Sequence, residues 1–170
     1  DLYLPESISL IGLKQFNLPF SGMKVNHYIL WNDKTRHAWL FDVGPDANEI
    51  VDFVRSTDLN IVSIFLTHTH LDHIYCINEL RGKVGNPPVW VHQLETIINS
   101  VSIVEGYRNS LGGIKLVALH THGHSVGGLT YLVDGLPCPV AIVGDALFAG
   151  SMGGGMVSYA DALKTNREKI

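Results

Sequence analysis

The densest group of side chains capable of chemistry is Thr67-His68-Thr69-His70-Leu71-Asp72-His73, which holds three histidines and an aspartate. His68 and His70 are two residues apart, so in an extended chain both rings point to the same side. Imidazole nitrogens and carboxylate oxygens suit Zn²⁺, Fe²⁺ or Mn²⁺. The spacing therefore predicts a metal site at this turn.

Two members of the turn also have ordinary structural interpretations. Asp72 precedes a helix-like stretch and has the side chain of a helix N-cap. His73 could be a first-turn residue of the same helix. Three imidazoles within six residues are difficult to satisfy electrostatically without a metal or an anion, so we favour Asp72 and His73 as ligands.

A second group of histidines, His120, His122 and His124, follows a predicted strand. Period-2 spacing would place all three rings on one face of a straight strand, but Gly123 makes a straight path doubtful. Each of them taken alone is more often structural. The spacing alone leaves open which one is a ligand.

Two single aspartates end predicted strands. Asp145 follows the apolar run 141–143 and Gly144, and the interpretations are a bridging metal ligand or a loop or capping residue. Asp42 precedes Val43-Gly44, where turn chemistry is the alternative. Its functional interpretation is a carboxylate that orients a ligand histidine or a metal-bound water.

The elements that would position these groups alternate between strands and helices. The run 61–67 is apolar and β-branched, as in a strand covered on both faces, and ligands often bind at the carboxyl end of such strands. Strands are predicted at 8–13, 25–31, 38–42, 61–67, 89–92, 114–120, 129–133 and 139–144, and helices at 45–55, 72–81, 93–100 and from Ser158. Residues 101–113 fit neither pattern. This order predicts an α/β protein with two sheets.

Length and composition limit the class of protein. A chain of 170 residues fits one domain, here residues 1–170, and its 46% hydrophobic content supplies a core without help from metal. The formal charge of −4 offers no basic face for nucleic acid. No segment reaches the ~18 apolar residues that cross a membrane. Cys76 and Cys138 cannot make a disulfide framework, and reduced thiols favour the cytoplasm. We therefore expect a small molecule as the partner.

Together these motifs resemble the metallo-β-lactamase superfamily. The resemblance rests on Asp42, on the turn 67–73, on Gly-His-Ser-Val-Gly-Gly at 123–128 and on Gly-Asp-Ala-Leu-Phe at 144–148. It implies an αβ/βα sandwich of four layers. It further implies a first metal held by His68, His70 and His124, a second held with Asp72 and His73, and Asp145 as the bridge. Two Zn²⁺ ions would then be the cofactors, with Fe²⁺ or Mn²⁺ as alternatives.

The chain departs from the family pattern in three places. The usual prolines around the Gly-His pair are absent from 121–128, and Tyr75-Cys76 replaces a usual glycine pair. The family also carries a later strand with a final Gly-His. The sequence ends at Ile170, so we expect the domain to lack its C-terminal strand and helix.

The resemblance implies a hydrolase in which a metal-bound hydroxide attacks an acyl ester, a thioester or a similar small substrate, as in the hydroxyacylglutathione-hydrolase-like group. Asp72 and Asp145 are then the candidate catalytic residues that accept the proton of the water. One alternative on the same fold is a persulfide dioxygenase with a single iron held by His68, His124 and Asp145. The other alternative is a non-catalytic metal-binding domain. The oligomeric state cannot be inferred from the sequence.

Overall fold

The computed structural model describes residues 11–95 and 97–170, which form two sheets and the helices that cover them. The larger sheet has six strands in chain order: β1 (Ile11–Phe20), β2 (Met23–Asn32), β3 (His37–Phe41), β4 (Asn60–Phe65), β5 (Val89–His92) and β6 (Ser100–Ile103). Strands β1 to β3 are antiparallel, whereas β3 to β6 run parallel. The β1–β2 hairpin turns through Ser21 and Gly22, both at positive φ.

The second sheet has four antiparallel strands in the order β10 (Val140–Ile142), β9 (Leu129–Asp134), β8 (Ile114–His120) and β7 (Arg108–Leu111). After β10 the chain makes a short 3-10 turn, η1 (Gly144–Ala146), and then a two-stranded hairpin of β11 (Leu147–Phe148) and β12 (Ser151–Met152). This hairpin leads into the last helix of the described chain.

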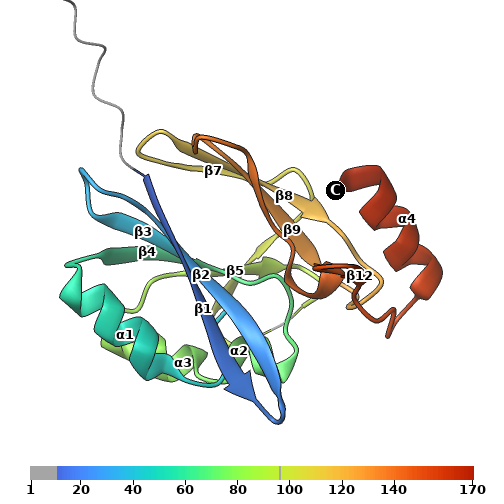
Figure 1. Cartoon of the computed structure of the whole chain (residues 1–170), viewed down its shortest axis with the longest axis horizontal. Helices are drawn as coiled ribbons and strands as arrows, with labels where there is room; N and C mark the ends of the chain where they lie inside the picture. Colours follow the sequence, from blue (N-terminus) through green and yellow to red (C-terminus); the bar gives the residue numbers. More distant parts are fainter. Residues whose placement is uncertain (1–10, 96) are drawn as a thin grey trace, which may run out of the picture.

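The helices lie on the outer faces of the two sheets. Helix α1 (Ala47–Ser56) and helix α3 (Ile77–Lys83) lie together on one side of the six-stranded sheet, and α4 (Tyr159–Lys169) lies beside the second sheet (Figure 1). A short helix, α2 (Leu71–Ile74), precedes α3. None of the helices in the described residues is long and apolar enough to span a membrane. The layers confirm the predicted αβ/βα sandwich.

Two hydrophobic cores hold the layers together. One lies between α1 and the larger sheet and includes Ile29, Leu40, Ile50 and Ile64. The other lies between the two sheets, where Phe41 and Phe65 pack against Tyr131 at ring-centroid distances of 5.6 and 5.4 Å. Strands β3 and β4 contribute to both cores. They are therefore covered on both faces, as the apolar run at 61–67 predicts.

One predicted helix is interrupted in this structure, and another is wrong. The stretch 72–81 is broken into α2 and α3, because the N–H of Cys76 donates to Gly44 O at 3.1 Å instead of to Asp72 within a continuous helix. The described part of the stretch 93–100 contains turns and the first residue of β6, since the N–H of Gln93 donates to Ile103 O at 3.0 Å. This bond keeps Gln93 paired with β6.

The remaining differences concern the bounds of strands. The ambiguous stretch 101–113 holds most of β6 and all of β7, and β10 is shorter than the predicted strand 139–144. The predicted strand 8–13 lies partly outside the described residues, and its described part belongs to β1. Strands β3, β4, β8 and β10 end just before Asp42, the turn 67–73, the loop 121–128 and Asp145 respectively.

Candidate metal centre

The histidine-rich turn follows β4 directly and is anchored to the end of β3. Thr67 donates its backbone N–H and its hydroxyl to the two carboxylate oxygens of Asp42, at 2.7 and 2.8 Å. The rings of His68 and His70 lie on the same side of the turn, with centroids 4.5 Å apart. The extended geometry expected for these two histidines is therefore present.

His124 reaches this turn from the loop after β8. Its Nε2 atom lies 3.0 Å from Nδ1 of His70, and its ring centroid lies 5.0 Å from that of His68. Its Nδ1 atom lies 2.8 Å from Gly154 O, which fixes Nδ1 as the donor, so that the lone pair of the neutral ring is on Nε2. One ligand atom from each of His68, His70 and His124 lies within 4.8 Å of the other two.

The other two histidines of the second cluster belong to a different part of the structure. His120 stacks on His92 with a centroid distance of 4.1 Å, and His122 lies 4.5 Å from His120. Neither belongs to a group of converging ligand atoms among the described residues. The choice among the three that the sequence left open is thus decided by position, and it is His124 that lies at the turn.

A second group of ligand atoms adjoins the first. His68, His73 and Asp145 also offer ligand atoms within 4.8 Å of one another. Asp145 Oδ1 lies 3.2 Å from His73 Nε2, and its Oδ2 lies 3.5 Å from His124 Nε2, so this carboxylate faces both groups. Asp145 stands in η1 and not at the end of β10 itself.

Asp72 lies beside the second group. Its Oδ2 atom is 3.6 Å from His73 Nε2, and it belongs to neither converging set among the described residues. The N-cap position of α2 is occupied by His70, so Asp72 is not the cap that its sequence position suggested as an alternative. Its place as a metal ligand stays a prediction.

Asp42 has both of the roles considered for it: it lies in a turn, and its carboxylate contacts a candidate ligand histidine. Its φ of 57° is the left-handed conformation that aspartate tolerates in turns. Its Oδ2 atom also lies 2.9 Å from Nδ1 of His73, with both side chains 3% exposed. A carboxylate on one ring nitrogen sets the tautomer and leaves the other nitrogen available to a metal.

Burial and charge move the pKa values of the buried histidines in opposite directions. Burial, with the nearby His73, lowers the pKa of His68 to about 3. Burial would also lower the pKa of His73, but the charge of Asp42 and the contact with Asp145 outweigh it and raise that pKa to about 10. In the metal-free protein His73 therefore holds a proton more readily than His68, because the carboxylates of Asp42 and Asp145 lie next to its ring.

The donor set fits a divalent cation. His68 Nε2 is buried without a hydrogen-bond partner among the described residues, whereas His73 Nε2 has the carboxylate of Asp145 at 3.2 Å. An unsatisfied buried nitrogen carries a free-energy cost that coordination to a metal would remove. Imidazole and carboxylate ligands are those of zinc, iron and manganese sites. The residues present therefore fit a metal centre of one or two ions.

Sequence reasoning missed two buried residues near the site. His27 on β2 is fully buried, and burial lowers its pKa to about 4. The alternation of Val25, His27 and Ile29 on the helix-facing side of β2 is the signal that could have revealed it. Glu95 is 6% exposed and contacts both histidine-bearing segments, but the wrong helix at 93–100 concealed it.

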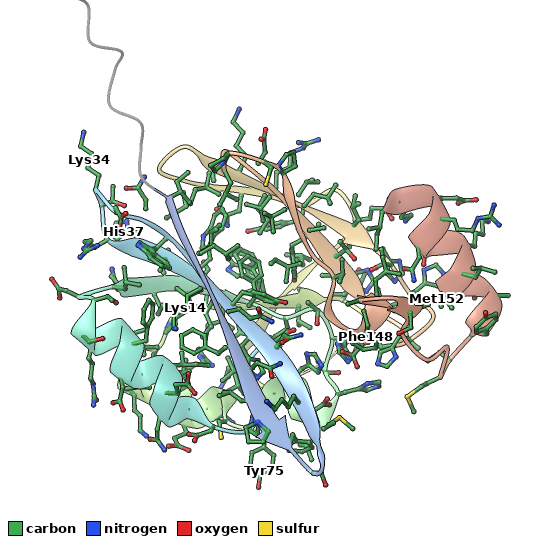
Figure 2. The ribbon with its side chains drawn as sticks, viewed as in Figure 1. Lys14, Lys34, His37, Tyr75, Phe148 and Met152 are labelled. Atoms are coloured by element: carbon green, nitrogen blue, oxygen red, sulfur yellow. The ribbon has the colours of Figure 1, made fainter. Side chains whose placement is uncertain are left out.

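A cavity of about 310 Å³ opens next to His73 and Asp145. Lys24, Asn26 and Tyr28 of β2 line one side of it. Val143, Leu147 and Phe148 line the other side. Figure 2 shows Phe148 between the β1–β2 hairpin and α4. The cavity can therefore admit a small molecule to the candidate centre.

Comparison with known proteins gives consistent results. The sequence model of the metallo-β-lactamase superfamily matches residues 22–100. A probable metallo-hydrolase of Streptococcus pyogenes is 30% identical over 154 residues, and a hydroxyacylglutathione hydrolase of Hahella chejuensis is 30% identical over 139 residues. The crystal structure of the B3 metallo-β-lactamase BLEG-1 superposes with a TM-score of 0.82 at 26% identity.

The extent of these matches differs. The streptococcal match covers 75% of this chain and 64% of the relative, and the Hahella match covers 80% and 52%. The BLEG-1 match covers 94% of this chain and 85% of that structure. The chain thus spans between half and two thirds of the length of the two curated relatives.

Proposed function

Because the chain belongs to the metallo-β-lactamase superfamily, we propose that it is the metal-binding part of a metal-dependent hydrolase that acts on an acyl ester or thioester. Three observations support the proposal. The candidate ligands converge at the ends of separate strands, the buried Nε2 atom of His68 lacks a hydrogen-bond partner among the described residues, and a cavity opens beside the group. Two of the relatives are a probable metallo-hydrolase and a hydroxyacylglutathione hydrolase.

In this proposal His68, His70 and His124 would hold a first metal ion, and Asp72 and His73 would hold a second. Asp145 lies within reach of both groups and would contribute a carboxylate to both sites. Zinc is the expected metal, with iron and manganese as alternatives. When bound, such ions supply Lewis acidity and lower the pKa of water enough to give a nucleophile at neutral pH.

The protein's own residues orient the reactants. Asp42 holds the ring of His73, and Gly154 O holds the ring of His124, so both Nε2 atoms are fixed before a substrate arrives. Asp145 and Asp72 are partly exposed carboxylates, at 24% and 18%, placed to accept a proton from water.

The cavity favours a substrate with both a charged and an apolar part. Among the described residues that line it, Lys24 is the one lysine or arginine, and it would attract a carboxylate of the substrate. Leu147 and Phe148 present apolar surface on the opposite side. An acyl thioester that carries a carboxylate has both features.

One observation carries the proposal: ligand atoms of His68, His70 and His124, from segments more than 50 residues apart, meet within 4.8 Å. The test is the metal content of the purified chain, together with turnover of a panel of acyl esters and thioesters that includes a hydroxyacylglutathione. We expect bound zinc and hydrolysis of at least one substrate, with the activity removed by a chelator and restored by metal.

Two results would replace this proposal with one of its alternatives. One iron per chain, with oxygen uptake on a glutathione persulfide, would identify a dioxygenase. Tight metal binding without turnover of the panel, by a chain that includes any further residues of the natural protein, would indicate a non-catalytic metal-binding domain.

A further inference from the structure

Glu95 connects the two segments that carry the candidate ligands. It follows β5, and its carboxylate is buried between the turn 67–73 and the loop 123–128. Its Oε2 atom accepts a hydrogen bond from the hydroxyl of Thr69, and its Oε1 atom accepts one from the backbone N–H of Gly127 at 2.9 Å. One side chain thus joins two segments that are far apart in the sequence.

The positions of the two donors make this connection specific to the site. Thr69 stands between His68 and His70, and Gly127 stands three residues after His124. The distance between His70 Nδ1 and His124 Nε2 is 3.0 Å, so these two rings meet next to the connection. A change in the separation of the segments would therefore change the separation of these nitrogen atoms.

The loop is shaped to accept Glu95 closely. A Cβ atom on Gly127 would lie 2.5 Å from Cγ of Glu95 and 2.9 Å from Nδ1 of His92. Neither distance is compatible with ordinary van der Waals contact. Only glycine at position 127 lets the backbone approach the carboxylate at this distance.

We propose that Glu95 is a positioning residue that fixes the separation of His70 and His124 for metal binding. The inference rests on the proposed metal centre and names a residue outside its ligand set. Mutation of outer-shell groups that orient metal ligands typically changes metal affinity or activity by roughly 10- to 100-fold, and we expect an effect of this size for Glu95.

The loop after β8 has other anchors, so the loss of Glu95 should be local. Gly123 O accepts from the N–H groups of Val157 and Ser158, each at 3.0 Å. The N–H of Thr121 donates to Gly128 O at 2.8 Å. These bonds tie the loop to the residues just before α4 and close the loop at its two ends. We therefore expect the fold to survive while the spacing of the ligands relaxes.

The experiment measures zinc affinity by competition with a chelator, and the absorption spectrum of the Co²⁺-loaded protein. Glu95→Ala and Thr69→Val should each weaken zinc binding roughly 10- to 100-fold and change the Co²⁺ spectrum. Glu95→Gln should stay within about 3-fold of the wild type, because its oxygen still accepts from Gly127 and its amide can donate to Thr69. Gly127→Ala should resemble Glu95→Ala.

Asn32→Ala is the matched control for general destabilisation. Asn32 is also buried, and it joins two turns away from the site by donating to Gly112 O at 2.7 Å and accepting from Lys34 N at 2.9 Å. This variant should lower the melting temperature of the metal-free protein but leave zinc affinity unchanged.

The outcomes separate this inference from the proposed function. A wild-type chain that binds no zinc, iron or manganese contradicts the metal centre itself. A wild type that binds zinc, with Glu95→Ala and Thr69→Val equally tight, overturns only the role of Glu95. The role is also overturned if Glu95→Gln binds as weakly as Glu95→Ala, since the amide keeps both hydrogen bonds.

Discussion

The Nδ1 atom of His73 lies 2.9 Å from Oδ2 of Asp42, and both side chains are almost completely buried. The contact joins the end of β3 to the first turn after β4. It directs Nε2 of His73 toward Asp145, 3.2 Å away. A carboxylate outside the ligand set thereby determines which nitrogen of a candidate ligand faces the centre.

Asp42→Asn tests this contact. Asparagine tolerates the positive φ at this position, so the variant removes the charge with little backbone strain. We expect affinity for the second metal ion to fall roughly 10- to 100-fold, because His73 loses its orienting carboxylate. Metal stoichiometry and stepwise zinc titration measure the effect. Two equivalents bound as tightly as in the wild type would contradict the role of Asp42.

His70→Ala should abolish metal uptake and hydrolysis while the chain stays folded. The hydrophobic cores do not include His70, and its ring is only partly buried. Metal analysis and circular dichroism measure the two results. His120→Ala is the matched control, because His120 belongs to the other histidine cluster and should keep its metal. Normal metal content in His70→Ala would show that the ligand assignment is wrong.

Metal affinity should rise with pH. The pKa of His73 is raised to about 10 in the metal-free protein, so at neutral pH this ring carries a proton that a cation must displace. The raised pKa favours the protonated, metal-free form below pH 10, and the affinity should gain about one logarithmic unit per pH unit. Zinc competition at pH 6 to 8 measures the slope. It should be shallower in Asp42→Asn, which loses the main charge that raises this pKa.

His27 should make the metal-free protein less stable in acid. Its pKa is lowered from 6.5 to about 4 in the folded state, so the unfolded chain binds more protons between these values. The free energy of unfolding should fall by about 3 kcal/mol from this group as the pH drops from 6.5 to 4. Urea unfolding of the wild type and of His27→Leu, both in the presence of a chelator, isolates the contribution of His27 to this pH dependence. Identical pH profiles for the two proteins would rule the effect out.

Gly153→Ala should displace Asp145. A Cβ atom at position 153 would lie 1.5 Å from the backbone oxygen of Asp145, so the segment that carries this carboxylate must move. We expect weaker metal binding and loss of activity. Gly82→Ala is the matched control, because open space surrounds its site in α3. That variant should gain up to about 1 kcal/mol of stability. Metal content and thermal unfolding of both variants check the pair.

The fold could be predicted in outline because its periodicities are local. Alternation and apolar runs indicated most strands, and the run at 61–67 indicated a strand covered on both faces. The predictions failed where bonds from distant segments replaced local ones. Cys76 donates to Gly44 and interrupts a helix, and Gln93 remains paired with Ile103 where a helix was expected. The acceptors of these two hydrogen bonds lie outside the short stretches of sequence from which the helices were predicted.

The sequence by itself determined the chemistry: three imidazoles and a carboxylate in one turn, next to a strand too apolar to lie at the surface. These residues are neighbours in the chain, so backbone geometry alone brings His68 and His70 to one side. The tertiary structure decided the rest. It selected His124 over His120 and His122, turned Asp145 toward two groups, and placed Glu95 between the segments. Distances between remote segments depend on how the two sheets pack, and residue spacing along the chain does not encode that packing.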